Sequence, residues 1–416
     1  MIRISAEICA RCKGYKKLCG LSSCPLMIRY RTLMNIKNKI PFTKEFKGYT
    51  PPSGVVSEAY YPNVSLIYSI PPESDRESAR AYDDPVNWWG KYDLDNIISL
   101  RSSMVSGIIK INVKEPEKLI ERDISLALVS EKPVDSELYL KKIPNIKIKI
   151  DPFDSPRGLG AEAEKLVVSE NPHVPRSIEK ILWDDMKASE AVIHLYRNNL
   201  DVYMIQRAFS LGLLGRINRR LVPTRWAITA VDTILSLYFL KQIKDSEDIT
   251  EGVMYKISYL GNRFWIALLP GVYSFNWIEI WHPRTLYTKT ASSPVIVINT
   301  EDWRGEAEYM DGGYQAARFS VLEYLYKIRR RASVLVVREI TPEYYAPVGN
   351  WHIRESIRRA FQLGESIKIS GLEDVFRLLR NDLGENIVSE IASMKKDLRL
   401  YKDLVNKKLD QFIKKS

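Results

Sequence analysis

The only four cysteines of this 416-residue chain lie within sixteen positions near its start, at Cys9, Cys12, Cys19 and Cys24. The spacing C-x2-C-x6-C-x4-C allows four thiolates to converge on one tetrahedral ion, as in a structural zinc site. Two disulfides are the alternative, and they do occur inside the cells of hyperthermophiles. Because the cysteines cluster and the chain does not begin like a secreted protein, the pattern favours a metal. Zinc is the first choice, and an iron–sulfur cluster is the minority alternative.

Positive charge is concentrated at the two ends of the chain. The formal net charge is +11. Residues 1–50 hold eleven Lys and Arg against two acidic residues, and residues 393–416 hold eight against three. A basic end beside a metal-binding segment favours contact with a phosphate backbone, with Lys13, Lys16 and Lys17 as candidates. A solvated surface is the alternative.

The chain carries no signal for a membrane or for secretion. No apolar run approaches the ~18 residues that a membrane-spanning helix needs, and the most apolar stretch, 231–240, contains Asp232. The first residues do not resemble a secretory signal. We therefore expect a soluble protein located in the cytoplasm.

The order of elements predicts an α+β fold. Gly261-Asn262 separates two apolar runs as in a β-hairpin. Hairpins and helices follow one another without a regular βαβ alternation, which favours a mixed sheet over a doubly wound one. We expect helices at 94–103, 177–197 and 229–243, and an amphipathic helix after Gly312-Gly313 with Val321, Leu322, Leu325 and Ile328 on one face. Strands are expected at 64–70, 145–150, 253–260, 263–269, 272–281, 294–299 and 333–340.

Two further segments complete the predicted architecture. Residues 152–176 contain four prolines and are expected to form a long surface loop. From Ile387 onward, apolar residues step by four and three along the chain, which predicts one long C-terminal helix. The expected molecule is thus a mixed-sheet body with an N-terminal zinc knuckle and a long C-terminal helix.

Signals for catalysis are weak. The chain has none of the common phosphate-loop, dinucleotide-binding, serine-hydrolase or zinc-protease motifs. Carboxylates do gather around Trp303, and two or three of them could bind Mg²⁺ for phosphodiester hydrolysis. A solvated acidic loop is the alternative. These carboxylates are Glu301, Asp302, Glu306, Glu308 and Asp311.

Clusters of arginine are a stronger signal. Between Asp201 and Asp232 the chain has no acidic residue but five arginines, namely Arg207, Arg216, Arg219, Arg220 and Arg225. Later sets occur at 327–331 and at 354–359. Each could line a phosphate-binding groove, although ordinary helix-end charges explain the later sets equally well. The stretch 222–226, with Asp232, is where we would look for chemistry, since a turn and a helix N-terminus there would suit a phosphate.

Several stretches together resemble the archaeal Nre family of DNA-repair proteins. The cysteine segment Cys9–Pro25 is similar to the family's N-terminal zinc-finger motif, and Leu221–Asp232 is similar to its most distinctive central stretch. Three C-terminal stretches add to the resemblance, which covers nearly the whole chain. They are Asp302-Trp303, Gly312–Arg318 and Arg338–Tyr344.

The resemblance implies a role in the response to DNA damage. For some members it also implies docking on the sliding clamp, PCNA, through a C-terminal PIP motif. Here the tail offers Asn406, Leu409, Phe412 and Ile413, with Asn406 in place of the usual glutamine and Ile413 in place of the second aromatic residue. Leu409 and Phe412 also continue the apolar spacing of the preceding helix, so a purely structural tail is the alternative.

The sequence therefore predicts a DNA-repair factor that binds DNA through basic surfaces and docks on the clamp. A metal-dependent nuclease, or another enzyme acting on DNA or a nucleotide, is the alternative, and no catalytic residue can be assigned. The expected organisation is a zinc-binding segment (1–50), an N-terminal-type body (51–290), a C-terminal-type domain (291–405) and a docking tail (406–416).

Overall fold

The structure is a computed structural model, and it describes residues 43–72, 75–144, 158–285, 287–288, 291–394, 396 and 398–400, with isolated positions 11, 12, 16, 18, 24 and 27. The chain divides into two compact units. We call residues 25–235 with 347–349 the N-unit, and residues 1–24, 236–346 and 350–416 the C-unit. The division at Leu235 and Ser236 falls within a helix, α11 (Thr224–Ile243). The four segments expected from the sequence stay a prediction.

The N-unit is built on a six-stranded mixed sheet in the order β1-β5-β6-β4-β3-β2. Only β4 and β6 pair in parallel, and the other neighbours are antiparallel. Leu66, Tyr68 and Leu138 are fully buried on these strands, and the Tyr68 hydroxyl meets Ser136 Oγ at 2.7 Å. The strands are β1 (Glu45–Thr50), β2 (Gly54–Val56), β3 (Asn63–Ile70), β4 (Val105–Asn112), β5 (Val134–Leu140) and β6 (Leu159–Val168).

Short helices lie between these strands and after them along the chain. In α5, Asp93 accepts a hydrogen bond from the backbone of Asn96 at 2.8 Å, which caps the first turn. Leu94, Ile97 and Ile98 then repeat on the buried face. The helices are α3 (Arg76–Arg80), η1 (Ala81–Asp83), α4 (Pro85–Trp88), α5 (Leu94–Ser103), α6 (Glu117–Ile120), α7 (Ile124–Ala127), α8 (Arg176–Leu182), α9 (Ala188–Arg197), α10 (Val202–Ser210) and η2 (Arg216–Asn218).

The C-unit holds a second six-stranded mixed sheet, ordered β10-β9-β11-β8-β7-β12. Its central strand β11 is buried along its whole length and pairs in parallel with β9 and antiparallel with β8. The strands are β7 (Gly252–Tyr259), β8 (Asn262–Leu269), β9 (Ser274–Trp281), β10 (Val295–Glu301), β11 (Ser333–Ile340) and β12 (Glu365–Ile369).

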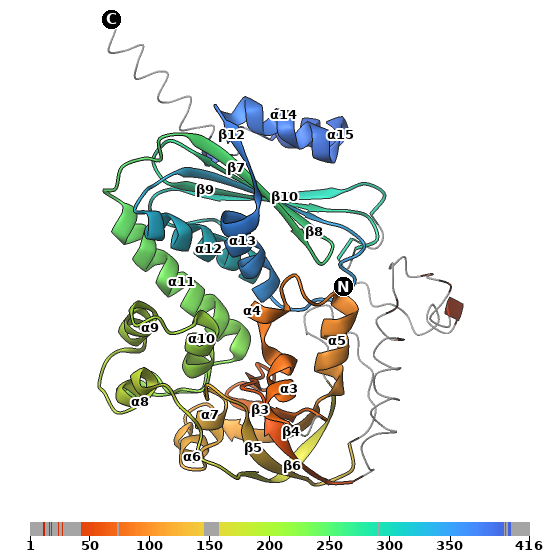
Figure 1. Ribbon diagram of the computed structural model, residues 1–416, viewed down its shortest axis with the longest axis vertical. Coiled ribbons are helices and arrows are strands. Elements are labelled where there is room, and N and C mark those ends of the chain that lie inside the picture. The colour runs from red at the N-terminus through yellow and green to blue at the C-terminus, as the bar shows by residue number, and fades with distance from the viewer. Residues whose placement is uncertain are drawn as a thin grey trace, which may run out of the picture. The chain divides into compact units, whose positions relative to one another are not determined.

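Helices cover both faces of this sheet, α14 (Leu372–Leu383) and α15 (Glu385–Ser393) on one and α12 (Gly312–Ile328) and α13 (Trp351–Leu363) on the other (Figure 1). On the first face Ile278 and Leu335 of the sheet share a core with Phe376 and Ile391. On the second, Phe275 packs edge-on against Tyr314 at 5.2 Å between ring centroids. The unit is a three-layer α/β/α arrangement.

Most predicted elements of the C-unit are confirmed. The hairpin forms between β7 and β8, but its two turn residues are Leu260 (φ 50°) and Gly261 (φ 68°), one position earlier than the expected Gly261-Asn262, because Asn262 already pairs with Tyr259. Two consecutive residues with positive φ are the mark of a two-residue turn that matches the twist of its strands. The strand expected at 333–340 forms with those ends, and the helix expected after Gly312-Gly313 forms as α12 (Gly312–Ile328). The mixed α+β class is therefore confirmed.

Three expectations need correction. The prolines of 152–176 do not mark a continuous loop, because β6 (Leu159–Val168) lies between them and pairs with β4 and β5. The single helix expected at 177–197 is two helices, α8 and α9. The long helix expected from Ile387 is interrupted, since α15 ends at Ser393 and the buried Leu398 lies outside any helix. The strand expected at 145–150 lies outside the described residues.

Within the described part of the chain, no helix is long and apolar enough to cross a membrane.

Candidate nucleic-acid interface

The stretch 221–226 is held in place by hydrogen bonds on both of its sides. The backbone nitrogens of Leu221 and Val222 donate to the carbonyls of Val113 and Ser210, at 2.8 and 2.9 Å. Thr224 Oγ1, at the start of α11, accepts from the backbone of Val56 at 2.9 Å. Three separate segments of the N-unit, at Val56, Val113 and Ser210, thus fix where α11 begins. The two residues that follow Thr224 therefore extend from a rigid backbone.

Arg225 and Trp226 are exposed, and Trp226 lies beside the exposed Tyr61, whose neighbour in the chain, Tyr60, is also exposed. The indole of Trp226 packs on Tyr61 with 5.3 Å between ring centroids. Trp226 is 47% exposed, Tyr61 48% and Tyr60 88%. Glu58 accepts from Trp226 Nε1 at 3.1 Å and from Arg225 Nη1 at 2.9 Å. We call Tyr60, Tyr61, Arg225 and Trp226 the aromatic–arginine platform.

This platform has the chemistry of a surface for unpaired bases. Half-exposed aromatic faces offer stacking to any base, because every base has a π-face. The carboxylate of Glu58 holds the indole and the guanidinium side by side, so both are oriented before any ligand arrives. Exposed aromatic side chains that gather in one place, rather than singly, mark an interaction surface.

The other candidate arginines of the N-unit are used differently. Arg216 Nη1 donates to the carbonyl of Trp183 at 2.9 Å, and Arg219 donates to the carbonyl of Leu182. Both carbonyls lie at the C-terminal end of α8, where a cation is favoured by the helix dipole. Arg220 is exposed. The structure therefore gives Arg216 and Arg219 a structural partner, and their contact with phosphate stays a prediction.

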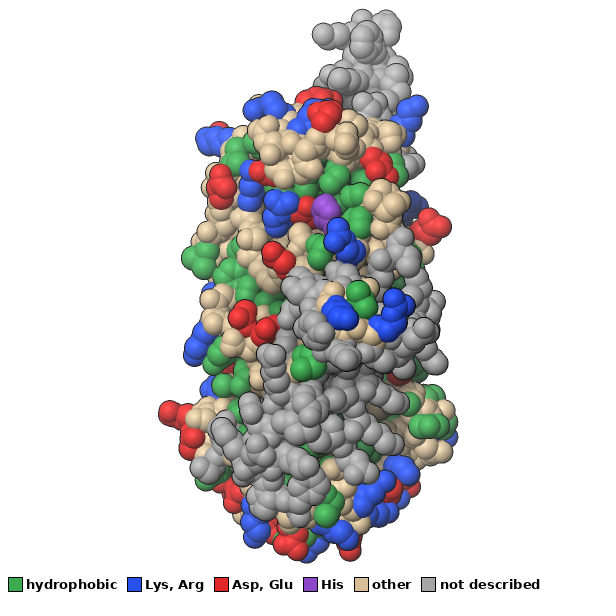
Figure 2. All heavy atoms as spheres, turned by 90° about the vertical axis from the view of Figure 1, so that its right-hand side faces the viewer, with side chains coloured by type: hydrophobic (Ala, Val, Ile, Leu, Met, Phe, Trp, Pro, Cys, Tyr) green, Lys and Arg blue, Asp and Glu red, His purple; other side chains and the backbone are tan. Residues whose placement is uncertain are grey.

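Arg207 is only partly exposed, and its Nε atom is buried. Burial lowers the pKa of Arg207, and the carboxylates of Asp83, Asp201 and Asp84 oppose that shift. On the described part of the face drawn in Figure 2, Lys and Arg lie among Asp and Glu and do not form one continuous basic patch. Arg216, Arg220 and Arg225 are thus exposed, whereas Arg207 and Arg219 are only partly so, and the sequence did not distinguish them.

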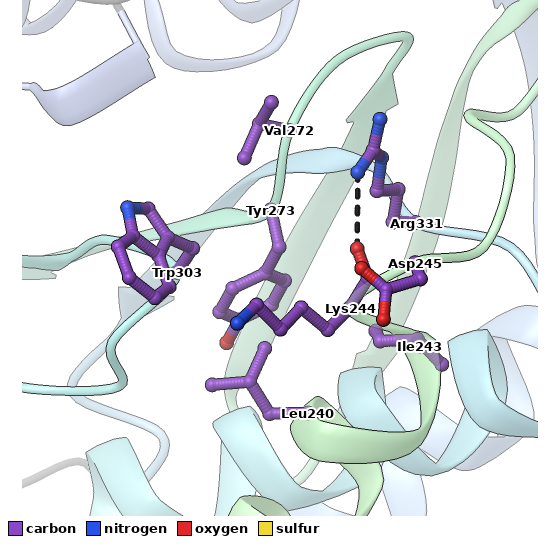
Figure 3. A pocket seen from close by; sticks show the side chains of 8 residues that line it. All are labelled: Leu240, Ile243, Lys244, Asp245, Val272, Tyr273, Trp303 and Arg331. Carbon is purple, nitrogen blue, oxygen red and sulfur yellow. Dashed lines mark hydrogen bonds between the residues drawn. The ribbon is translucent and has the colours of Figure 1, made fainter.

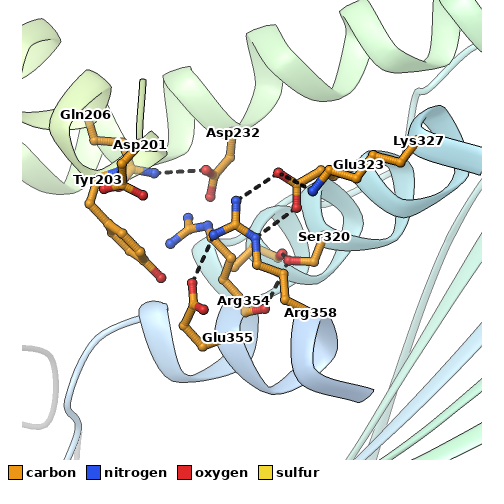
Figure 4. A network of polar contacts seen from close by, with 11 residues as sticks. Asp201, Tyr203, Gln206, Asp232, Ser320, Glu323, Lys327, Arg354, Glu355 and Arg358 are labelled. Atoms are coloured by element: carbon orange, nitrogen blue, oxygen red, sulfur yellow. Dashed lines mark hydrogen bonds and ion pairs between the residues drawn. The ribbon is translucent and has the colours of Figure 1, made fainter. Parts of the chain in front are cut away.

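Asp232 does not belong to the exposed platform. Its side chain is fully buried, and Oδ1 accepts from Gln206 Nε2 at 2.9 Å (Figure 4). Arg225, Thr224 and Asp232 are thus close in sequence, but the structure presents only the first of them at the surface.

The carboxylates around Trp303 do not come together as a metal site. Glu301 accepts from Arg318 and Tyr273, and Asp311 caps α12 by accepting from the backbone of Tyr314 at 2.7 Å. Asp302 is bound by Arg304, whose hydrogen bonds hold the pKa of that carboxyl below its usual value. Among the residues that the structure describes, no group of three or more potential ligands could hold a metal ion.

Arg358 belongs to an ion network, and Arg354 is buried against an aromatic ring. Arg358 binds Glu323 through two hydrogen bonds of 2.8 and 2.9 Å and donates to Glu355 at 3.0 Å (Figure 4). Arg354 is only 1% exposed, and its guanidinium lies 5.5 Å from the Phe319 ring centroid. These contacts join α12 to α13 within the C-unit.

The stretch Arg338–Tyr344 likewise brings charge into the interior. Arg338 donates to Glu279 at 2.7 Å and to Asn262 at 2.9 Å, and its third hydrogen bond, 3.2 Å long, is to His352. Burial raises the pKa of Glu279, with Arg338 opposing the shift. For Glu339 burial also raises the pKa, but hydrogen bonds from His282 and Arg263 outweigh it and leave the pKa below its usual value.

Comparison with known proteins decides the family. The chain matches the description "Archaeal Nre, N-terminal" over residues 18–288 and "Archaeal Nre, C-terminal" over residues 301–412. The chain belongs to the archaeal Nre family. The distinctive stretch Leu221–Asp232 lies in the first matched region, and Arg338–Tyr344 lies in the second.

Three relatives extend over most of the chain. It is 38% identical to a DNA repair protein NreA of Archaeoglobus fulgidus, over 85% of this chain and 88% of the relative. It is 32% identical to the DNA repair protein NreB of the same organism, over 89% and 92%. It is 33% identical to a DNA repair protein NreA of Haloferax volcanii, over 84% of each. No solved structure matches this Nre chain.

Several predicted Nre site residues lie outside the described residues. These are Cys9, Cys19, Lys13, Lys17 and the tail residues Asn406, Leu409, Phe412 and Ile413. Of the remaining candidates in the N-terminal segment, Cys12 is buried, Cys24 is partly exposed and Lys16 is exposed. The aromatic residues Tyr60 and Tyr61 were not predicted, since neither lies near Trp226 in the sequence.

The Arg358 network predicts a large loss of stability when its cation is removed. Arg358→Met leaves Glu323, whose side chain is 4% exposed, without its two-point partner. Removing one member of a buried ion pair costs about 3–5 kcal/mol, and Lys327, 3.5 Å from Glu323, offsets part of this. Urea unfolding monitored by circular dichroism measures the change.

Arg377→Met is the matched control, because Arg377 also pairs with an acid but is exposed. It is expected to leave the unfolding midpoint nearly unchanged. An Arg358 variant with normal stability and weakened DNA binding would contradict the structural role and favour the phosphate groove.

Proposed function

We propose that this protein acts in DNA repair and binds single-stranded DNA through the aromatic–arginine platform. The observation that carries the proposal is the exposed contact of Trp226 with Tyr61 beside Arg225. Its curated relatives are named DNA repair proteins, which supports the same role here.

Unpaired DNA is the form of DNA that suits such a platform. In a duplex the base faces are covered by their neighbours, whereas in a single strand each face is open to an aromatic side chain. Arg225, together with the exposed Arg220, would contact phosphates without reading sequence. Repair intermediates expose single strands, so a sequence-tolerant platform fits the proposed role.

Docking on the sliding clamp is the second part of the proposal. Leu409 with Phe412 and Ile413 supplies the apolar side chains that a PIP motif places in the clamp's pocket, and Asn406 supplies an amide at its start. Tethering to the clamp would raise the local concentration of the platform at replicated or repaired DNA.

Zinc bound by Cys9, Cys12, Cys19 and Cys24 is the third part. Four thiolates form the donor set of a closed structural zinc site, and the low exposure of Cys12, at 5%, is in keeping with such a site. The metal would supply a fixed crosslink in this short segment. It would thereby order Lys13, Lys16 and Lys17, which are then available to contact phosphate.

Alanine at the platform is expected to weaken binding to a short thymidine oligonucleotide. Each stacked base contributes about 1–3 kcal/mol, so Trp226→Ala and Tyr61→Ala should each weaken binding about 5- to 150-fold in fluorescence anisotropy titrations. Arg220→Ala should reduce the slope of the logarithm of the binding constant against the logarithm of salt concentration by about one, because one phosphate contact is lost. Trp183→Ala is the matched control, because Trp183 is also exposed but lies outside the platform. Equal losses for Trp226 and Trp183 would contradict a specific platform.

Truncation after Val405 tests the tail. The shortened chain should lose binding to the sliding clamp in calorimetric titration and keep its circular dichroism spectrum, because the residues removed would contact the clamp and not the core. Phe412→Ala should have the same effect, and Lys407→Ala should have little. Loss of stability on truncation would instead make the tail a structural part of the fold.

Metal analysis tests the cysteine site. The purified full-length protein should contain about one zinc per chain, and Cys12→Ser or Cys24→Ser should lower that content. Iron with visible absorption would identify a cluster instead. Thiols that cannot be titrated in the metal-free unfolded protein would identify disulfides.

A further inference from the structure

A pocket in the C-unit is lined by aromatic, aliphatic and charged side chains, and none of the residues of the aromatic–arginine platform lines it. Its volume is about 240 Å³, below the range of about 300 Å³ and more that is usual for drug-sized ligands. Figure 3 shows Trp303 and Arg331 on opposite sides of it, with Tyr273 between them. The size and the flat aromatic walls suit one planar ring system.

Trp303 provides a half-exposed aromatic face for stacking. It is 48% exposed, and it lies on the loop that follows β10. Lys244, at the end of α11, places its ammonium 5.3 Å from the centroid of the indole ring. Both residues line the pocket, so this exposed lysine occupies space that a stacked ring would take, and its flexible side chain could move aside.

The wall away from Trp303 carries a donor and an acceptor. Arg331 is fixed by a hydrogen bond of 2.6 Å to Asp248. A second hydrogen bond, 3.0 Å long, runs to the carbonyl of Lys244 (Figure 3). Asp245 lines the same side. A guanidinium and a carboxylate next to each other match the carbonyl and amino groups along the edge of a nucleobase.

The floor of the pocket is held rigid from below. Tyr273 is 3% exposed, and its hydroxyl donates to Glu301 at 2.6 Å. Burial, with the nearby Glu301 carboxylate, raises the pKa of Tyr273 well above its usual value, so this hydroxyl remains a donor. Glu301 is in turn bound by Arg318 at 2.8 Å, and both side chains are fully buried.

The same arginine fixes the loop that presents Trp303. Arg318 Nη2 donates to the carbonyl of Gly305 at 3.3 Å. Gly305 has φ +76°, and a Cβ there would lie 2.7 Å from Arg318 Nη2. Only glycine suits both the backbone angle and the close approach. Two of the stretches that carry the family resemblance, around Trp303 and around Arg318, are thus joined where Arg318 fixes the backbone of the loop that carries Trp303.

We propose that this pocket binds a single unpaired nucleobase, stacked on Trp303 and recognised along its edge by Arg331 and Asp245. Opposite charges surround the pocket, since Asp245 and Asp248 offset Lys244 and Arg331. The base, and not the phosphate, is therefore the group that gains most from binding. The proposal does not depend on the aromatic–arginine platform, because it rests on other residues.

The test uses the full-length protein and the four deoxynucleoside monophosphates, with deoxyribose 5-phosphate as the probe that lacks a base. Saturation-transfer NMR titration should show saturable binding of at least one monophosphate and little binding of the sugar phosphate. Trp303→Ala should weaken binding about 5- to 150-fold, and Trp303→Phe should keep most of it. Trp183→Ala is the matched control and should leave mononucleotide binding unchanged, because Trp183 is exposed but lies outside both this pocket and the platform.

Three results would overturn the proposal. The first is equal binding of the sugar phosphate, which would indicate a phosphate site. The second is unchanged binding of the monophosphate by Trp303→Ala. The third is that the parent protein binds none of the four monophosphates. Thermal unfolding of each variant serves as the fold check, and Trp303→Phe keeps the test informative if the alanine variant is unstable. Oligonucleotide binding that fails for Trp226→Ala while mononucleotide binding persists would separate the two sites.

Discussion

The ion pair between Arg318 and Glu301 is the interaction on which the surface of the C-unit depends. Both side chains have no exposure, so each charge is stabilised in the interior by the other and by its remaining hydrogen bonds. Through Tyr273 and Gly305 the pair also fixes two loops. A buried charge pair contributes little net stability compared with apolar packing, but it permits only one arrangement of the groups that bind it. Here that arrangement sets the position of Trp303.

Arginine serves two purposes in this protein, and the net charge of +11 does not distinguish them. Arg354, Arg338 and Arg318 are buried and join helices or strands. Arg225 and Arg220 lie at the surface. A count of positive charge therefore overstates the surface available to a phosphate backbone. The surface that we propose for nucleic acid, the aromatic–arginine platform, accordingly has three aromatic side chains and only one arginine.

The sequence predicted local structure well where the signal was local. The strand 333–340 is a continuous apolar run before its charged pair, and the helix 94–103 begins at a capping aspartate, so both ends were correct. Strand β6 was missed because Leu159–Val168 contains alanine, glutamate and lysine and lies between prolines. Its partners β4 and β5 stabilise it, and sequence pattern does not record pairing between distant segments.

In the candidate sites, too, the sequence did not reveal which distant residues meet or which aromatic side chains are exposed. The stretch 222–226 was singled out by its residues, but its partners Glu58, Tyr60 and Tyr61 lie over 160 positions earlier. Trp88 is fully buried while Trp226 and Trp303 are half exposed, and only tertiary packing distinguishes them. Leaving a large aromatic ring half exposed forgoes stabilisation of about 25 cal/mol for each Å² of apolar surface. The Trp226 ring is nevertheless held by its hydrogen bond to Glu58. The stabilisation that is forgone in the free protein becomes available when a ligand covers the exposed indole. An unstacked nucleobase exposes a flat apolar face of its own, so both partners would gain from that contact.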